Sequence, residues 1–242
     1  MQLDVVLSPS ALDPDAVKDH RVVMVDVLRA STTIATAIAN GARGIIPATD
    51  TGEAGRLAAT LDADASLLGG ERDGKRVDGF GAGNSPAEYG PEAVDGKTVV
   101  LTTTNGTRAL AKAKAGRSVA IGGFVNSQRA ADFLAEGLAA GTPGLILCAG
   151  WYGRVSLEDA LCAGLLVHLA TPPEKAGALS DPAKIAYALY QGSRDDIERA
   201  IRGTEHGRRL QGLGSGDDIA RCAALDELDV LPVLNDGRIT AG

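Results

Sequence analysis

The stretch 22–39 constrains the fold most, because its hydrophobic pattern changes from one period to another within a few residues. Residues 22–25 form a short apolar run that is β-branched enough for a buried strand. From Thr32 onward, small and apolar residues recur at helical spacing. Asp26 and Arg29 occupy the switch from strand to helix. Ligands of open α/β sheets bind at such junctions, so the stretch predicts an α/β unit with polar side chains at a strand end.

This junction has two interpretations. A helix N-terminus offers unpaired N–H groups that suit a phosphate, so Asp26, Arg29 and the neighbouring hydroxyls could form an anion or metal site. Alternatively, Ser31 or Thr32 simply caps the helix. Asp26 and Arg29 would then be a surface pair without a ligand. The stretch alone favours neither interpretation, and the remainder of the chain has to decide between them.

The same alternation of strand and helix patterns continues along the chain. Further apolar runs predict strands at 3–7, 45–48, 65–68, 98–101, 119–123, 145–148 and 230–234. Helical patterns predict helices at 53–61, 109–115, 127–140, 156–169, 182–191, 193–201, 204–214 and 217–225. Such alternation predicts a three-layer α/β/α fold with a largely parallel or mixed sheet. Pro232 places the last strand at an edge of that sheet.

The organisation of the chain indicates one folding unit. No linker clearly divides the 242 residues, so we expect a single unit over 1–242. If it contains two closely packed lobes, the loop at 171–180 is the best boundary. The longest stretch without a strand or helix pattern is 69–89, and loops of this length are usually functional or disordered. The rare aromatic residues Phe80 and Tyr89, with a helix start at 84–88, favour an ordered loop.

Composition excludes several classes of protein. Aromatic residues make up only 3% of a chain that is 45% hydrophobic, so aliphatic residues must fill the core. The net charge of −7 argues against nucleic-acid binding, which needs a basic surface, but leaves a small anionic substrate open. Neither a membrane-spanning run nor a signal-peptide pattern is present, so we expect no membrane partner. Three cysteines without a CxxC motif predict reduced thiols in a cytoplasmic protein.

Three predicted strand-to-helix junctions share small, polar residues: 26–33, 102–108 and 148–159. If the strands are parallel, all three lie at one edge of the sheet and can converge on a single cleft. Hydroxyls, Asn105, main-chain N–H groups and arginines there suit a phosphate or a carboxylate. Nearby acids could hold Mg²⁺, which prefers a few carboxylates plus water and substrate oxygens. The acids that we predict as metal ligands are Asp26, Glu71, Glu158 and Asp159.

Each of these features also has a purely structural explanation. Glu158 and Asp159 suit the first turn of any helix, because the helix dipole favours acids there. Residues 102–107 could be only a strand end, a turn and an N-cap. Cys148 is more typical of a small buried residue than of a nucleophile. His206 is an acid/base candidate or a histidine at a helix surface, and no P-loop, GxGxxG or GxSxG motif accompanies these residues.

Five segments together resemble the 2-phosphosulfolactate phosphatase (ComB-type) family over nearly the whole chain. They are VVMVDVLRASTTIATAIANGA (22–42), GERDGKRVDGFGAGNSPAEY (70–89), LTTTNGTRAL (101–110), CAGWYGRVSLEDALCAG (148–164) and HGRRLQGLGSGDDIARCAALDELDVLPVLNDGRI (206–239). The resemblance implies a Mg²⁺-dependent phosphatase that converts 2-phospho-3-sulfolactate to 3-sulfolactate and phosphate in coenzyme M biosynthesis. Relatives occur where no coenzyme M is made, so other phosphorylated 2-hydroxy acids are plausible substrates.

The resemblance and the junctions together give a hypothesis for the site. Asp26 would be a metal ligand or a water-orienting base, assisted by Arg29, and His206 an acid for the leaving alkoxide. Direct attack by a metal-activated water is favoured over a phospho-enzyme on Asp26, and both routes stay open. The expected substrate-binding residues are Ser31, Thr32, Arg72, Asn84, Ser85, Thr104, Asn105, Gly106, Thr107, Arg108, Arg154 and Arg208.

Two departures from the family pattern keep other functions open. Gly81 stands where the family has an acid, and Trp151 stands where it has a threonine. These changes imply altered specificity or a weaker catalyst. A non-catalytic anion-binding protein on the same scaffold is therefore one alternative, and another phosphate-ester enzyme such as a mutase or transferase is a second. The apolar segment 230–234 can pair within or between chains, which leaves a homo-oligomer open.

Overall fold

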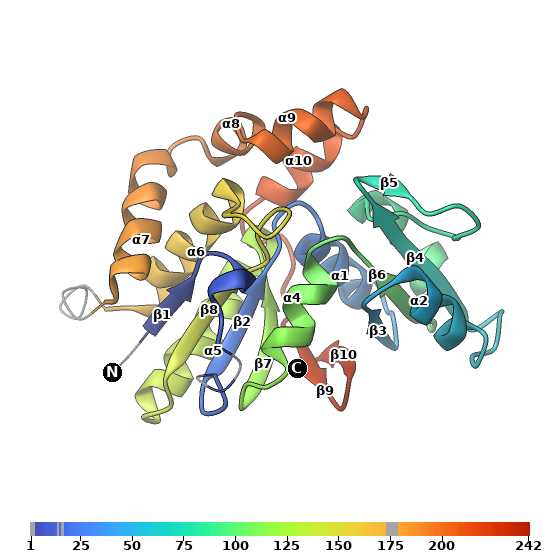
Figure 1. The fold of residues 1–242 in the computed structure, drawn as a ribbon, viewed down its shortest axis with the longest axis horizontal. Coiled ribbons are helices and arrows are strands. Elements are labelled where there is room, and N and C mark those ends of the chain that lie inside the picture. Colours follow the sequence, from blue (N-terminus) through green and yellow to red (C-terminus); the bar gives the residue numbers. More distant parts are fainter. Residues whose placement is uncertain (1–2, 14, 16, 173–178) are drawn as a thin grey trace.

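The computed structural model describes residues 3–13, 15, 17–172 and 179–242, which form a three-layer α/β/α fold around one sheet (Figure 1). The strands in spatial order are β1 (Leu3–Val6), β8 (Gly144–Cys148), β2 (Arg21–Val25), β7 (Ser118–Gly122), β9 (Pro232–Asn235), β10 (Arg238–Ala241), β3 (Gly44–Ala48), β6 (Thr98–Thr102), β4 (Ser66–Arg72) and β5 (Lys75–Arg76). The helices are α1 (Ala30–Ala39), α2 (Thr51–Ala58), α3 (Pro91–Val94), α4 (Gly106–Ala113), α5 (Ser127–Ala139), α6 (Leu157–Ala170), α7 (Asp181–Ser193), α8 (Ile197–Arg202), α9 (Glu205–Gly212) and α10 (Asp217–Ala223). The predicted fold class is confirmed.

The sheet consists of two parallel groups joined by an antiparallel hairpin. One group is β1, β8, β2 and β7, and the other is β3, β6 and β4. The hairpin of β9 and β10 runs antiparallel to its neighbours β7 and β3. The sheet is therefore mixed and mostly parallel. Within each parallel group, the carboxyl ends of the strands share one edge, and the three antiparallel pairings between β7 and β3 give the two groups opposite directions along the sheet.

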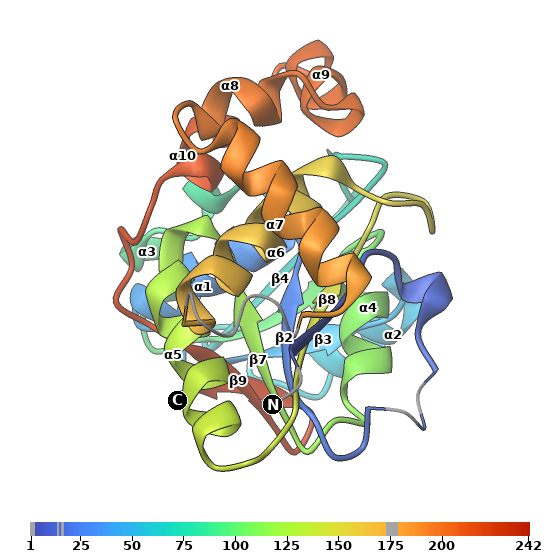
Figure 2. The ribbon, with the colours of Figure 1, turned by 90° about the vertical axis from the view of Figure 1, so that its left-hand side faces the viewer.

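Strand β2 is buried on both faces, which explains why apolar and polar residues do not alternate along it. Val23 and Val25 face one core, which α5 and α6 cover. Val22 and Met24 face the other core, which α1 and α4 cover. Because successive side chains of a strand point to opposite faces, a sheet covered on both sides needs apolar residues at every position. The side view shows α7 lying outside α6, as a further layer on the first face (Figure 2).

The predicted edge strand at 230–234 is wrong in its position. Strand β9 lies inside the sheet, where Leu234 pairs with Val119 of β7. Pro232 is the first residue of β9, a position at which the missing N–H does not interrupt the ladder. The prediction also missed β10, whose Ile239 is fully buried and pairs with Ile45 of β3.

The stretch 69–89 contains more regular structure than predicted. Strand β4 continues to Arg72 and pairs with β5 through a turn at Asp73 and Gly74. Both turn residues have positive φ, 56° and 84°, which is the conformation that an Asp-Gly hairpin turn requires. The predicted order of the loop is confirmed, because Tyr89 is fully buried and its hydroxyl donates to the Gly83 carbonyl at 2.7 Å.

Several helix starts differ from the prediction; α2 begins at Thr51 instead of residue 53, and α8 begins at Ile197 instead of residue 193. Helix α1 begins at Ala30 with Arg29 at the N-cap position, so neither Ser31 nor Thr32 is the N-cap. The Ser31 hydroxyl instead accepts the main-chain N–H of Asp26 at 2.9 Å. Helix α4 begins at Gly106, three residues before the predicted 109–115.

The last helices lie over the carboxyl ends of the strands. Figure 1 shows α8, α9 and α10 together above the central sheet. The proposed lobe boundary at 171–180 includes residues 173–178, which lie outside the described residues, so it stays a prediction. Within the described ranges, none of the helices has both the length and the apolar character of a membrane span.

Candidate functional site

One small, polar pocket of about 20 Å³ lies at the carboxyl ends of β2, β6 and β8. The three strand-to-helix junctions all contribute to it, which confirms that they converge on one cleft. The turn between β4 and β5 and helix α9 complete its wall. The lining residues are Asp26, Leu28, Arg29, Glu71, Asp73, Gly74, Asn84, Thr104, Asn105, Trp151, Tyr152, His206 and Arg209.

Asp26 occupies the end of β2 and is only 6% exposed. Its side chain accepts one long hydrogen bond, 3.4 Å from the N–H of Ala30. Burial raises the pKa of Asp26 to about 6; the negative charges of Glu71 and Glu158 act in the same direction, while His206 opposes them. A Cβ at Gly106 would lie 2.6 Å from Oδ2 of Asp26, so the first residue of α4 has to be glycine for this approach.

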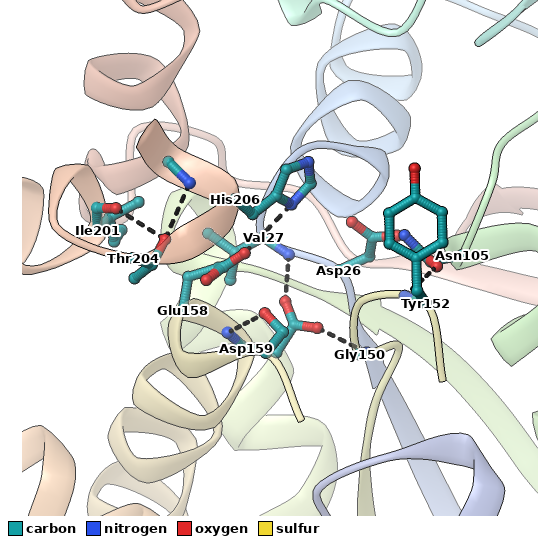
Figure 3. A network of polar contacts seen from close by, with 12 residues as sticks. Asp26, Val27, Asn105, Gly150, Tyr152, Glu158, Asp159, Ile201, Thr204 and His206 are labelled. Atoms are coloured by element: carbon teal, nitrogen blue, oxygen red, sulfur yellow. Dashed lines mark hydrogen bonds and ion pairs between the residues drawn. The ribbon is translucent and has the colours of Figure 1, made fainter. Parts of the chain in front are cut away.

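His206 reaches the pocket from helix α9 and is held by two neighbours, of which Figure 3 shows Glu158. Its Nδ1 lies 3.2 Å from Oε1 of Glu158, a side chain that is 2% exposed. Its ring stacks on Trp151 with a centroid distance of 5.4 Å and an interplanar angle of 14°. Burial works to raise the pKa of Glu158, but the hydrogen bond and charge of His206 outweigh it and the pKa is lowered. The pair therefore fixes the ring and directs Nε2 away from Glu158.

Arg29 brings a buried guanidinium to the pocket. Its Nη1 donates to Oδ2 of Asp218 at 2.6 Å, and its Nη2 donates to the Gly74 carbonyl at 3.1 Å. The other oxygen of Asp218 accepts the Ser85 hydroxyl at 2.6 Å. Asp218 thus orients Arg29 and joins it to α10, which identifies a site partner that the sequence reasoning missed.

Two predicted metal ligands, Glu71 and Asp159, are engaged with loop N–H groups. Glu71 accepts the N–H of Thr104 and the N–H of Gly74, each at 2.7 Å. Asp159 accepts the N–H of Val27 at 2.8 Å and that of Gly150 at 2.9 Å. Burial raises the pKa of Asp159, and the charges of Asp26 and Glu158 add to this effect. These two carboxyl groups tie the junction loops together.

Asn84 presents a different kind of polar group to the pocket. Its side chain is 4% exposed, and within the described residues its buried Oδ1 has no hydrogen-bond partner. Its main-chain carbonyl accepts the Thr33 hydroxyl at 2.8 Å, which fixes the backbone. An oriented, unpartnered oxygen of this kind is suited to a ligand, because a buried polar atom without a partner is unfavourable.

Several predicted binding residues lie outside the pocket lining. They are Ser31, Thr32, Arg72, Ser85, Gly106, Thr107, Arg108, Arg154 and Arg208. Arg72 donates to the Thr102 hydroxyl at 2.8 Å, and Arg154 is exposed beside Glu205. Arg208 donates to the carbonyl of Gly203 on the outside of α9. Of the five arginines that the sequence offered as cations for the substrate, Arg29 lines this pocket, whereas Arg72, Arg108, Arg154 and Arg208 do not.

The structure adds residues that the sequence reasoning did not select. Arg209 lies three residues after His206 on the same face of α9, so helical spacing could have identified it. Its guanidinium donates to the Asp73 carbonyl at 3.0 Å. The Tyr152 hydroxyl donates to Oδ1 of Asp73 at 2.5 Å across the pocket mouth. This contact joins segments far apart in sequence, and no local pattern predicts it.

The described residues contain no group of three or more His, Cys, Asp or Glu side chains arranged to hold a metal ion. Among the buried pocket oxygens of the described residues, Asn84 Oδ1 has no hydrogen-bond partner, and the Asp26 carboxylate accepts one long hydrogen bond. Cys148 does not line the pocket, and burial raises the pKa of its thiol well above the usual range. A buried thiol with a raised pKa is a poor nucleophile, as expected from the structural interpretation.

Fold and pocket together define an α/β protein with an acid, an imidazole and guanidinium groups around one site at the strand ends. Comparisons with known proteins narrow this class. The family described as 2-phosphosulpholactate phosphatase matches residues 6–237. The chain belongs to the 2-phosphosulfolactate phosphatase family, a family of phosphoric monoester hydrolases.

Curated relatives match along most or all of their length. A protein of Caldicellulosiruptor saccharolyticus is 41% identical over 89% of each chain. One from Caldanaerobacter subterraneus is 37% identical over 91% of this chain and 90% of its own, and one from Clostridium acetobutylicum is 33% identical over 99% and 100%. Each of the three is named a probable 2-phosphosulfolactate phosphatase. The predicted family is thereby confirmed.

The raised pKa of Asp26 predicts a pH-dependent stability effect. Because its folded-state pKa of about 6 exceeds the unfolded value, this group favours folding below pH 4, and the contribution is lost as the pH rises through 6. Replacing Asp26 with Asn should therefore stabilise the metal-free protein at pH 7.5, by on the order of 3 kcal/mol, and have little effect at pH 4.

Thermal and urea unfolding in EDTA at both pH values measure this difference. The matched control is Asp64→Asn, which makes the same change at an exposed position and should leave stability nearly unchanged. Equal or lower stability of the Asp26→Asn protein at pH 7.5 would contradict the assigned environment of Asp26.

Proposed function

We propose that this chain hydrolyses the phosphate ester of a small 2-hydroxy acid such as 2-phospho-3-sulfolactate, giving 3-sulfolactate and phosphate. The observation that carries the proposal is the convergence of Asp26, His206 and Arg29 on one pocket in a member of a phosphatase family. The relatives named as probable 2-phosphosulfolactate phosphatases support this substrate. Where 2-phospho-3-sulfolactate is the substrate, we propose coenzyme M biosynthesis as the setting of the reaction.

Asp26 is the general base of the proposed reaction. Its pKa of about 6 leaves it ionised at neutral pH yet basic enough to accept a proton from an attacking water. Its single long hydrogen bond leaves oxygen lone pairs available for that water. A phospho-enzyme on Asp26 would use the same carboxylate as a nucleophile. We favour water, because the aspartyl-phosphatase signature does not surround Asp26.

His206 is the general acid. When Nδ1–H donates to Glu158, Nε2 is the nitrogen that can give a proton to the leaving alkoxide. Glu158 accepts that hydrogen bond at 3.2 Å and so holds the ring in the orientation that the transfer needs. Stacking on Trp151 holds the ring in one plane, so Trp151 at this position is compatible with catalysis.

Cationic groups stabilise the phosphoryl group during transfer. Arg29 and Arg209 both line the pocket, from the start of α1 and from α9. Phosphoryl transfer depends mainly on positioning and on charge stabilisation, and a guanidinium fork matches phosphate oxygens. Asp218 fixes the direction of Arg29, so its donors are oriented before the ester arrives.

We extend the proposal to Mg²⁺. Asp26 and Asn84 Oδ1 would hold the ion, since oxygen ligands and one or two carboxylates suit it. When bound, Mg²⁺ supplies a Lewis acid that neutralises negative charge on the phosphate. Glu71, Glu158 and Asp159 would lie around the site without binding the ion themselves, because each already has a hydrogen-bond partner.

A cytoplasmic location is also part of the proposal. Cys148, Cys162 and Cys222 are all free and buried, which supports a reducing compartment. A homo-oligomer stays a prediction, because β9 takes its partners within this chain and another surface would have to form the interface.

A panel of phosphorylated 2-hydroxy acids tests the function. We expect phosphate release with Mg²⁺, loss of release in EDTA and recovery when Mg²⁺ is restored, measured as inorganic phosphate. Ligand-dependent thermal stabilisation without release would instead identify an anion-binding protein. Release or turnover that requires an added acceptor would identify a transferase or mutase.

His206→Gln tests the general acid. We expect kcat for alkyl phosphate esters to fall by about 10²–10⁴-fold, the usual contribution of acid catalysis. An aryl phosphate such as 4-nitrophenyl phosphate should lose far less, because its leaving group needs no proton. The matched control is His168→Gln, at an exposed position of α6. Equal losses for alkyl and aryl esters would contradict the acid role.

A further inference from the structure

A second cavity, of about 210 Å³, adjoins the catalytic pocket and differs from it in charge. The two share Thr104, Asn105 and Tyr152 as a common wall. Arg108 and Lys112, one turn apart on α4, line the second cavity, and its lining contains no Asp or Glu. In a chain with a net charge of −7, a hollow with two cations and no acid is a local exception.

The charges of these two residues are available to a ligand. Within the ranges that the structure describes, no carboxylate lies at ion-pair distance from Arg108 or Lys112. The Lys112 ammonium donates to the Pro9 carbonyl at 2.7 Å, which fixes the side chain at the cavity without neutralising it. Arg108 is exposed at the rim.

The sizes of the two spaces complement each other. The catalytic pocket is much the smaller of the two spaces, about 20 Å³ against about 210 Å³, so the part of the ester beyond its phosphoryl group has to extend elsewhere. Thr104 and Asn105 line both spaces, so the larger cavity is the space that an arm leaving the pocket on this side would enter. An arm that enters beside two unpaired cations gains most when it carries a negative charge.

We propose that this cavity, with Arg108 as its main determinant, is a subsite for a second anionic group on the ester, a carboxylate or a sulfonate. The inference rests on the proposed phosphatase function and adds to it the residue that selects acidic esters. It also assigns a binding role to Arg108, which the sequence analysis predicted to bind substrate but which lies outside the catalytic pocket.

The experiment compares Arg108→Gln with wild type on three esters. 2-Phospholactate and its carboxamide differ by one carboxylate, and 2-phospho-3-sulfolactate and 2-phospholactate differ by one sulfonate. We expect the preference in kcat/KM for the more anionic ester to fall about tenfold or more in at least one pair. The pair of esters whose preference falls identifies the group, carboxylate or sulfonate, that the cavity binds. Arg117→Gln, the same change near the opposite end of the sheet, is the matched control and should preserve both preferences.

Equal changes for all three esters, or unchanged preferences, would overturn the proposal. Calorimetric titration with 3-sulfolactate, which has no ester, separates this result from failure of the proposed function. If wild type releases no phosphate, weaker 3-sulfolactate binding by the Arg108→Gln protein still supports the subsite. Equal binding by the two proteins, or no binding by either, overturns it.

Discussion

Two buried carboxyl groups hold the pocket loops in place at the strand ends, and the geometry of the site depends on them. Asp159, in the first turn of α6, accepts main-chain N–H groups of Val27 and Gly150 and so joins the loops after β2 and β8. Glu71 joins the turn after β4 to Thr104 after β6 in the same way. Such hydrogen bonds are strong where water is excluded, so the loops keep their positions before any ligand binds.

Of the buried carboxylates that line the pocket in the described residues, Asp26 has the weakest hydrogen bonding and no ion-pair partner. Arg29 is balanced by Asp218, and His206 by Glu158, whereas Asp26 accepts one hydrogen bond of 3.4 Å. Its raised pKa expresses the unfavourable free energy of that buried charge. The buried charge of Asp26 becomes less unfavourable when a cation binds beside it or when the carboxylate takes a proton from the attacking water. The burial of this one charge therefore both makes Asp26 a stronger base and lowers the stability of the folded protein.

Local patterns predicted the fold class and the meeting of the three junctions at one pocket, although β2 and β8 belong to one parallel group and β6 belongs to the other. They could not place β9 and β10, since the pairing of Ile239 with Ile45 joins residues that are distant in sequence. The same limit applies to Asp218, which reaches Arg29 only after α10 packs over the strand ends. The residue type made Glu71 a candidate metal ligand. The N–H group of Thr104 that it accepts is brought to it by tertiary structure, which local sequence patterns do not predict.

In the proposed reaction Asp26 performs the chemistry, while Arg29 and Arg209 bind the phosphate without needing its carboxylate. Phosphate release from 2-phospho-3-sulfolactate by the Asp26→Asn protein, measured beside phosphate-dependent thermal stabilisation, tests this most directly. The account predicts release at least about a hundredfold slower than wild type, with phosphate stabilisation retained. Near-normal release by that protein would contradict the account.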